Sequence, residues 1–413
     1  MSYLSDVKRI SGGVCAPKGF AAGGINCGIK AKSKKPDLAL LYSEKPCTAA
    51  AMFTTNKVKS ACVLVSQEHV SSGVLRAVIA NSGNANACTG EGGIAAARKM
   101  ASLAAGLFGI SPKEVAVAST GVIGVPLPME PIESAMTSLR DALKSSEEGH
   151  LTALEAIMTT DIRKKDGAVE IEIDGKSVKI GGMIKGSGMI HPNMATMLCF
   201  ITTDAAVSRD ALDASLRSAV RRSFNRVSVD GDTSTNDMII VMANGEAGNS
   251  PIKAGTPGYE VFSQALEDFC VDLAREMARD GEGATKLVTV TVEGAKDEET
   301  AEILVKSVVS SSLVKAACFG SDANWGRILC AMGYSGADFN PDEVDVSFAS
   351  EGEEIAVCRK GASLPFSEDD AKRILKREEI EIRIKAGKGN GSAAAWGCDL
   401  TYDYVKINGD YRS

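Results

Sequence analysis

The sequence predicts an α/β protein that is large enough for two hydrophobic cores. Residues 169–179 alternate between apolar and polar side chains, as a half-buried strand does, whereas residues 261–279 repeat apolar side chains at helical spacing. Both patterns occur in both halves of the chain, so helices are expected to cover the faces of sheets. At 413 residues the chain exceeds the roughly 250–300 residues at which a single core stops growing.

In the first half, strands are expected where short apolar, often β-branched runs lie between glycine-rich turns. Residues 1–60 are interpreted as short strands and turns. Further strands are expected at 63–65, 77–80, 115–118 and 169–179, the last of which turns back at Asp174-Gly175. Helices are expected at 95–107, 130–144 and 151–158, where apolar residues recur at helical spacing.

The second half repeats this mixture. A strand is expected at 197–201, followed by a helix that Ser208 caps, and then by a polar loop, 230–237. The helix at 261–279 has the clearest periodicity, and Gly281 is suited to end it. The remaining expectations are strands at 238–242, 288–292, 379–385 and 404–407, a helix from 313 and a loop at 324–327.

Composition excludes several classes of function. The net charge of −7 and the lack of a dense Lys/Arg block argue against a nucleic-acid surface, and no apolar run approaches the length of a membrane span. Eleven cysteines without CxxC spacing, together with an N-terminus that does not resemble a signal peptide, favour a reducing cytoplasm. The chain has only three histidines, and their spacing argues against a zinc site and against a Ser-His-Asp triad. The acidic loop 230–237 lacks the glutamate of an EF-hand, which argues against a calcium site. No metal is therefore expected.

The stretch with the most distinctive chemistry runs from Lys185 to Leu198. A glycine-rich approach, Lys185-Gly186-Ser187-Gly188, delivers Thr196 to the start of an apolar strand. If the bond between Ala195 and Thr196 breaks, Thr196 acquires a free amine that can act as the general base for its own hydroxyl. Composition alone fits a simpler alternative, a glycine-rich turn before a buried strand.

Two other polar segments follow expected strands. Ser119-Thr120-Gly121 places a hydroxyl beside a glycine amide, and acyl transfer needs such donors for the developing oxyanion. The residues alone are also compatible with an ordinary strand end and turn. Asn81-Ser82-Gly83-Asn84-Ala85-Asn86 is rich in side-chain amides, and it is either the entry loop of the next helix or a support for an active site or a cleavage turn.

These segments, taken together and in order, carry a resemblance to a known family. The segments are 81–90, 119–124, 185–190, 193–197, 230–237, 281–286, 324–328 and 408–413. They resemble the corresponding motifs of the ornithine acetyltransferase family, the bifunctional glutamate N-acetyltransferases of arginine biosynthesis. The resemblance spans essentially the whole chain.

The resemblance implies a role for individual residues. Thr196 would be the nucleophile, cleavage would separate Ala195 from Thr196, and Thr120 with Gly121 would form the oxyanion hole. The implied substrate contacts are Thr159 (with Thr160 as the close alternative), Lys185, Thr196, Glu282, Asn408 and Ser413. Many relatives end in threonine, but Ser413 keeps the hydroxyl.

The implied activity is a self-processing acetyl transfer from N2-acetylornithine to glutamate through an acetyl-threonine, without a cofactor. Acetyl-coenzyme A is kept as a second candidate acetyl donor. The implied fold of the protein is a layered α-β-β-α lobe plus a smaller α/β lobe. The processed chains, 1–195 and 196–413, would stay together and pair as an α2β2 heterotetramer. The alternative is an N-terminal-threonine amidase or aminopeptidase on the same scaffold, with water as the acceptor; a binding protein without enzymatic activity would remain a single chain.

Overall fold

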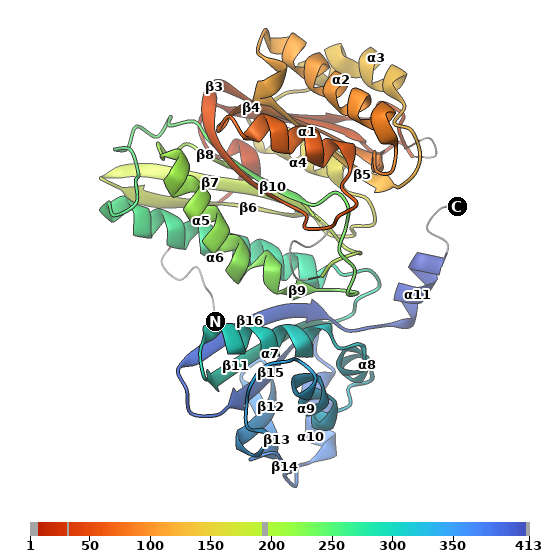
Figure 1. Ribbon diagram of the computed structural model, residues 1–413, viewed down its shortest axis with the longest axis vertical. Coiled ribbons are helices and arrows are strands. Elements are labelled where there is room, and N and C mark those ends of the chain that lie inside the picture. The colour runs from red at the N-terminus through yellow and green to blue at the C-terminus, as the bar shows by residue number, and fades with distance from the viewer. Residues whose placement is uncertain (1–6, 31–32, 192–196, 410–413) are drawn as a thin grey trace. The chain divides into compact units, whose positions relative to one another are not determined.

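The computed structural model describes residues 7–30, 33–191 and 197–409, and these form two compact units (Figure 1). Unit 1 comprises Met1–Gly186, Thr196–Arg222 and Thr233–Leu273, and unit 2 comprises Ser187–Ala195, Ser223–Asp232 and Ala274–Ser413. The chain passes from unit 1 to unit 2 between Gly186 and Ser187, inside the glycine-rich approach. Each unit contains residues from both predicted processed chains, 1–195 and 196–413, so the units do not follow the predicted cleavage.

Unit 1 is built on a mixed sheet of nine described strands, in the order β1-β6-β7-β8-β10-β3-β4-β5, with β2 paired to β3. The strands are β1 (Lys8–Ile10), β2 (Phe20–Ile25), β3 (Leu38–Phe53), β4 (Val74–Asn84), β5 (Val115–Val122), β6 (Lys165–Ile173), β7 (Lys176–Lys185), β8 (Leu198–Thr203) and β10 (Met238–Ala243). Strands β4 and β5 are parallel, as are β8 and β10, whereas β7 and β8 are antiparallel.

Helices cover both faces of the strands β3, β4 and β5. The helices of this unit are α1 (Ala61–Val70), α2 (Gly90–Phe108), α3 (Met129–Asp141), α4 (Glu147–Ile157), α5 (Arg209–Arg222) and the first part of α6 (Pro257–Arg279). Val115 and Val117 pack in the core formed with α1, α2 and α3, whereas Ala116 and Ala118 pack in the core that contains α4. Because both faces are buried, β5 is apolar throughout its first half instead of alternating.

Unit 2 has its own sheet, in the order β14-β13-β12-β15-β11-β16-β9. The strands are β9 (Val227–Ser228), β11 (Leu287–Ala295), β12 (Val344–Ser350), β13 (Glu353–Arg359), β14 (Ala362–Ser363), β15 (Glu379–Ala386) and β16 (Gly391–Cys398). The helices are α7 (Glu298–Ser310), α8 (Ser312–Gly320), α9 (Trp325–Gly333), α10 (Glu368–Leu375) and α11 (Tyr402–Gly409). The first four of these helices contribute to one core with β11, β12 and β15.

Within the described ranges, no single helix is both long and apolar enough to cross a membrane. The bent pair α7 and α8, which meet at 59°, passes that test of length and composition only when the two are joined. Most apolar residues of both helices, including Val305, Val308 and Val314, are buried in the core of unit 2, whereas Ile303 and Leu313 are exposed.

The structure confirms the α/β class and most of the expected elements. Four local predictions are wrong. Residues 63–65 lie in helix α1, because the side chain of Ser60 accepts a hydrogen bond from the Val63 amide and begins a helix there. Asn324 caps helix α9 in the same way, so 324–327 is not a loop. Residues 404–407 lie in helix α11, and β3 is a single strand of 16 residues where only short strands were expected.

Candidate active site

Strand β5 carries Thr120 and Gly121, the residues predicted to form an oxyanion hole. The strand continues through both residues, so they do not lie in the turn that the sequence also allowed. Thr120 is buried, and its Oγ1 accepts a hydrogen bond from Lys185 Nζ at 3.1 Å. A hydroxyl that accepts a bond from an ammonium group still has its own hydrogen to donate. The structure therefore brings the predicted oxyanion-hole threonine and the predicted substrate lysine together.

Gly121 occupies a backbone conformation and a space that suit only glycine. Its φ is +133°, and a Cβ atom there would lie 2.4 Å from the carbonyl carbon of Gly83 and 2.6 Å from the amide nitrogen of Asn84. The neighbouring strand β4 has an irregular register at this point, between Gly83 and Asn84. The close approach of the two strands thus fixes where the Gly121 amide lies.

The amide-rich segment 81–86, which forms the end of β4 and the two residues after it, contacts this part of β5. Asn236 donates from Nδ2 to the carbonyl oxygens of Ala85 at 2.6 Å and of Ser119 at 2.8 Å. The Ser119 hydroxyl donates to Asn81 Oδ1 at 2.6 Å. These buried bonds fix the position of Ser119, the residue before Thr120.

Asp161 joins the two segments that carry the predicted substrate contacts of unit 1. Its Oδ1 accepts from the Gly186 amide at 2.7 Å, and its Oδ2 accepts from the Thr159 amide at 2.9 Å. Lys165 Nζ donates to the same Oδ1 at 2.6 Å, and both side chains of this ion pair are fully buried. Thr159 and Lys185 are therefore positioned by one carboxylate, through the backbone of Thr159 and of the residue after Lys185.

The charge of Asp161 is set by its two lysine neighbours. Burial alone would raise the pKa of the Asp161 carboxyl, because a low-dielectric environment disfavours the charged form. Lys185 and Lys165, together with the Lys165 hydrogen bond, outweigh this effect and hold the pKa of Asp161 below its ordinary value. Asp161 is accordingly an anion at neutral pH.

Two further aspartates hold the backbone on either side of the predicted cleavage bond. In unit 2, Asp230 accepts from the amides of Met189 and Ile190 at 2.6 and 2.9 Å. In unit 1, the Met197 amide donates to Asp237 Oδ1 at 3.1 Å, and complete burial raises the pKa of the Asp237 carboxyl well above its ordinary value. Ala195, Thr196 and Ser413 lie outside the described residues, so their predicted roles stay predictions.

In unit 2, the predicted substrate residues Glu282 and Asn408 are in contact. Asn408, on α11, donates from Nδ2 to Glu282 Oε2 at 2.8 Å. The Glu282 amide donates to the Ser187 carbonyl at 2.9 Å, which places the carboxylate against Gly188. A Cβ atom at Gly188 would lie 2.3 Å from that carboxylate, so the glycine leaves the space that Glu282 occupies.

Sequence reasoning did not select Asp161, Lys165 or Asp237 as site residues. Asp237 is one of three aspartates in the polar loop 230–237, which is among the segments that carry the family resemblance, but the sequence alone assigns this aspartate no role of its own. Asp161 directly follows Thr159 and Thr160. Its position in the sequence next to a predicted substrate contact is the feature by which it could have been selected. Across the described residues, no three His, Cys, Asp or Glu side chains gather as metal ligands would.

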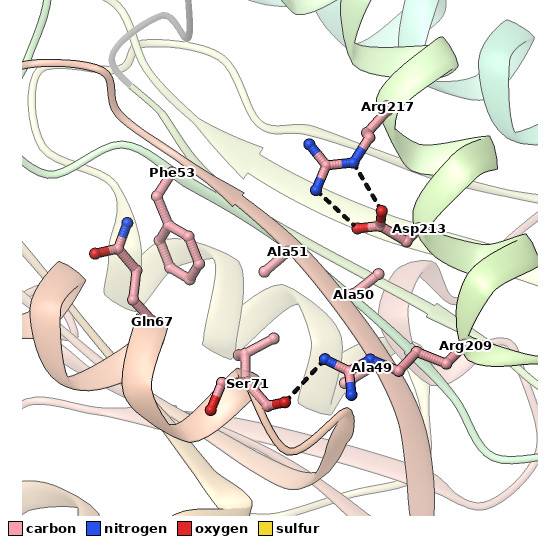
Figure 2. A pocket seen from close by; sticks show the side chains of 10 residues that line it. Ala49, Ala50, Ala51, Phe53, Gln67, Ser71, Arg209, Asp213 and Arg217 are labelled. Carbon is pink, nitrogen blue, oxygen red and sulfur yellow. Dashed lines mark hydrogen bonds and ion pairs between the residues drawn. The ribbon is translucent and has the colours of Figure 1, made fainter.

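A surface pocket lies elsewhere in unit 1, between β3, α1 and α5, and contains none of the predicted site residues (Figure 2). Its floor is formed by Ala49, Ala50 and Ala51. Arg217 is paired with Asp213, with Nε to Oδ2 at 2.7 Å, and Arg209 donates to the Ser71 carbonyl at 2.8 Å. Because both arginines are already engaged, the pocket does not present an obvious anion site.

Comparisons with known proteins cover the whole chain. The model of the ArgJ family matches residues 21–413. The chain is 53% identical over 405 residues to the arginine biosynthesis bifunctional protein ArgJ of Symbiobacterium thermophilum, covering 98% of this chain and 99% of that protein. It is 47% identical over 416 residues to ArgJ of Bacillus subtilis, covering 100% of both. Among solved structures, it is similar to an ornithine acetyltransferase complexed with ornithine from Mycobacterium tuberculosis (41% identity, 46% of this chain, 100% of that chain, TM-score 0.42).

Asp161→Asn should destabilise unit 1, because asparagine presents an NH₂ group to one of the two amides and leaves Lys165 as a buried cation without its anion. Breaking a buried ion pair costs about 3–5 kcal/mol, which corresponds to a fall of roughly 5–10 °C in the midpoint of thermal unfolding. Asp204→Asn is the matched control, since Asp204 is also fully buried and accepts from two backbone amides, those of Lys18 and Lys179. It should cost less, about 1–3 kcal/mol.

The same pair of variants gives a pH test. The pKa of Asp161 is lower in the folded chain than in the unfolded chain, so its contribution to stability is fully present above the ordinary value of 3.8. That contribution is lost as the pH falls below this value. The difference in unfolding midpoint between wild type and Asp161→Asn should therefore shrink below about pH 4. A difference that stays constant down to pH 3 would show that Asp161 is not a stabilising anion.

Proposed function

The chain belongs to the ArgJ family, and we propose that it transfers the acetyl group of N2-acetylornithine to glutamate through an acetyl-threonine on Thr196. It is an acyltransferase of arginine biosynthesis. The observation that carries the proposal is the identity of 53% over 98% of the chain with a curated ArgJ protein. Two contacts in the structure also support it: Lys185 donates to Thr120, and Asn408 donates to Glu282.

In the proposed reaction, self-cleavage between Ala195 and Thr196 first releases the α-amine of Thr196. This amine has an ordinary pKa of about 7.7–8.0, which suits a general base near neutral pH. It takes the proton of the Thr196 hydroxyl while the hydroxyl oxygen attacks the acetyl carbonyl. The Thr120 hydroxyl and the Gly121 amide bind the oxyanion. Collapse of the adduct transfers the proton to the departing amine, so ornithine leaves and acetyl-threonine remains.

Glutamate then enters, and its amine attacks the acetyl-threonine by the same steps in reverse. We propose that Lys185 binds the α-carboxylate that both substrates share, with Thr159, Glu282, Asn408 and Ser413 as further substrate contacts. No cofactor takes part, and acetyl-coenzyme A is the candidate second donor. The processed chains are proposed to remain associated as an α2β2 heterotetramer in the cytoplasm; eleven free cysteines support a reducing compartment.

Thr196→Ala should yield one uncleaved and inactive chain, because alanine has no hydroxyl to attack the preceding carbonyl. The measurement is the intact mass of the purified protein under denaturing conditions. Wild type should give two species, residues 1–195 and 196–413. Thr196→Ser keeps a hydroxyl and should still be cleaved, which controls for misfolding. Cleavage of the alanine variant would refute the assignment of the nucleophile.

Gly121→Ala should lower kcat by about 10²–10³-fold, the usual cost of removing one oxyanion-hole donor. The added Cβ cannot fit against Gly83, so the Gly121 amide must move. Gly124→Ala is the control, because Gly124 also has a positive φ, +81°, but nothing lies within 4 Å of its Cβ position. Near-normal kcat in Gly121→Ala would remove this residue from the oxyanion hole.

The acceptor distinguishes acetyl transfer from hydrolysis. With N2-acetylornithine as donor, release of ornithine should depend on added glutamate, and N-acetylglutamate should accumulate in equal amount. Ping-pong kinetics are expected, since the acetyl group stays on the enzyme between the two substrates. Release of acetate at the same rate without glutamate would instead support the amidase alternative, which the comparisons do not favour.

A further inference from the structure

Lys30 lies beside the predicted active site of unit 1 and has no role in the mechanism above. It lies in the connection between β2 and β3 and is half-buried. Its Nζ donates to the carbonyl oxygen of Met158 at 2.8 Å and to that of Pro36 at 3.3 Å. Met158 directly precedes Thr159, so the ammonium group is tied to the segment of a predicted substrate contact.

The position of Lys30 is fixed by a buried carboxylate. Asp37 is completely buried and accepts from the backbone amides of Cys27, Gly28 and Lys30 at 2.7, 3.2 and 2.9 Å. A carboxylate that binds three backbone amides within four residues holds the loop in one conformation. Lys30 is therefore a built feature of the fold and not a freely moving surface lysine.

The stem of Lys30 crosses strand β4 next to the predicted oxyanion hole. A Cβ atom at Gly83 would lie 2.9 Å from Lys30 Cγ, so the lysine stem packs on this glycine. Gly83 pairs with Gly121 in the sheet. Lys30 thus lies against the partner of Gly121 on one side and reaches the Thr159 segment on the other.

The charges around Lys30 leave its ammonium only weakly stabilised. The pKa of Lys30 is lowered to about 8: burial is the largest cause and Lys185 and Lys35 act in the same direction, whereas Asp37 and Asp161 oppose the shift. Its hydrogen-bond partners among the described residues are neutral carbonyls. Lys165, a fully buried lysine of this region, is instead bound directly to the Asp161 carboxylate.

The two substrates of the proposed function differ in charge at the end of the side chain. Both have an α-carboxylate, which Lys185 is proposed to bind, but ornithine ends in an ammonium group and glutamate ends in a second carboxylate. Resting on the proposed function, we propose that Lys30 is a specificity-determining residue that binds the side-chain carboxylate of glutamate. An ammonium held by two carbonyl oxygens has one N–H left for that carboxylate.

The same lysine can tolerate the ornithine side chain. When an ammonium group approaches, Lys30 can lose its proton at modest cost because its charged form is already disfavoured by burial. Neutral Lys30 keeps two N–H groups for the carbonyls of Met158 and Pro36, so the loop need not change. A residue of this kind allows one enzyme to accept a cationic and an anionic side chain in turn.

The test measures kcat/KM for each of the two substrates in wild type, Lys30→Met and Lys30→Arg. Ping-pong kinetics allow the two values to be determined separately. For Lys30→Met, kcat/KM for glutamate should fall on the order of 10- to 100-fold, the range for loss of a charged hydrogen bond. The value for N2-acetylornithine should change much less. Lys35→Met is the control, since Lys35 is an exposed lysine on the same loop. Intact mass should show normal cleavage in every variant.

The pH dependence separates recognition from support of the loop. We divide kcat/KM of wild type for glutamate by that of Lys30→Met, because the effects of all groups that titrate in both proteins are then removed from the ratio. It should fall as the pH rises through about 8, because wild type then loses the charge while keeping both carbonyl bonds. If Lys30→Met does not fold, Lys30→Arg is used in its place. Arginine stays charged, so the kcat/KM of Lys30→Arg for glutamate should rise relative to that of wild type above about pH 8.

Two results would overturn the inference. One is an equal fall in kcat/KM for both substrates in Lys30→Met, which would show a structural role. The other is a ratio that does not change with pH. Wild-type protein that transfers no acetyl group at all would instead refute the proposed function, and the inference with it.

Discussion

The structure depends on three aspartate side chains that accept hydrogen bonds from backbone amides near the predicted cleavage bond. Asp161 holds Gly186, Asp230 holds Met189 and Ile190, and Asp237 holds Met197, each within its own unit. A glycine-rich segment has large conformational freedom, and fixing one residue of it costs roughly 1–2 kcal/mol. Hydrogen bonds from the backbone amides to these side chains offset that cost, and at Asp161, which is ionised, the bond is charge-assisted and therefore stronger.

One of these aspartates, Asp230, also stabilises a strained backbone conformation. Met189 has a positive φ of 57°, which is unfavourable for a residue with a side chain by about 1–2 kcal/mol. Asp230 accepts hydrogen bonds from this residue and from the next, so the strained conformation is held by two bonds to one side chain. Strain of this kind at the edge of a reactive segment is consistent with a chain prepared for a specific local reaction.

Elements with an unbroken pattern were predictable from the sequence, whereas contacts between distant residues were not. The α6 helix and the β6–β7 hairpin follow directly from periodicity. Residues 63–65 were misassigned because a run of three apolar residues fits a strand or a helix equally well, and packing decides. Residues 404–407 belong to a short helix without buried residues, so no burial pattern in the sequence marks it as a helix. The motif residues Thr120, Lys185, Glu282 and Asn408 could be selected through a family resemblance. Asp161 could not, because Gly186, one of the groups it binds, lies 25 residues away in the chain.

The lysines of unit 1 show how one fold can give the same side chain different properties. Lys165 is bound to an ionised Asp161, and Lys185 lies within the electrostatic range of the same carboxylate. Lys30 is hydrogen-bonded to neutral carbonyls, so burial dominates and the pKa of Lys30 falls to about 8. A ping-pong transferase needs a constant charge for the group that its substrates share and an adjustable one for the group in which they differ. We propose that Lys30 supplies the adjustable charge, whereas Lys185 binds the carboxylate that both substrates share.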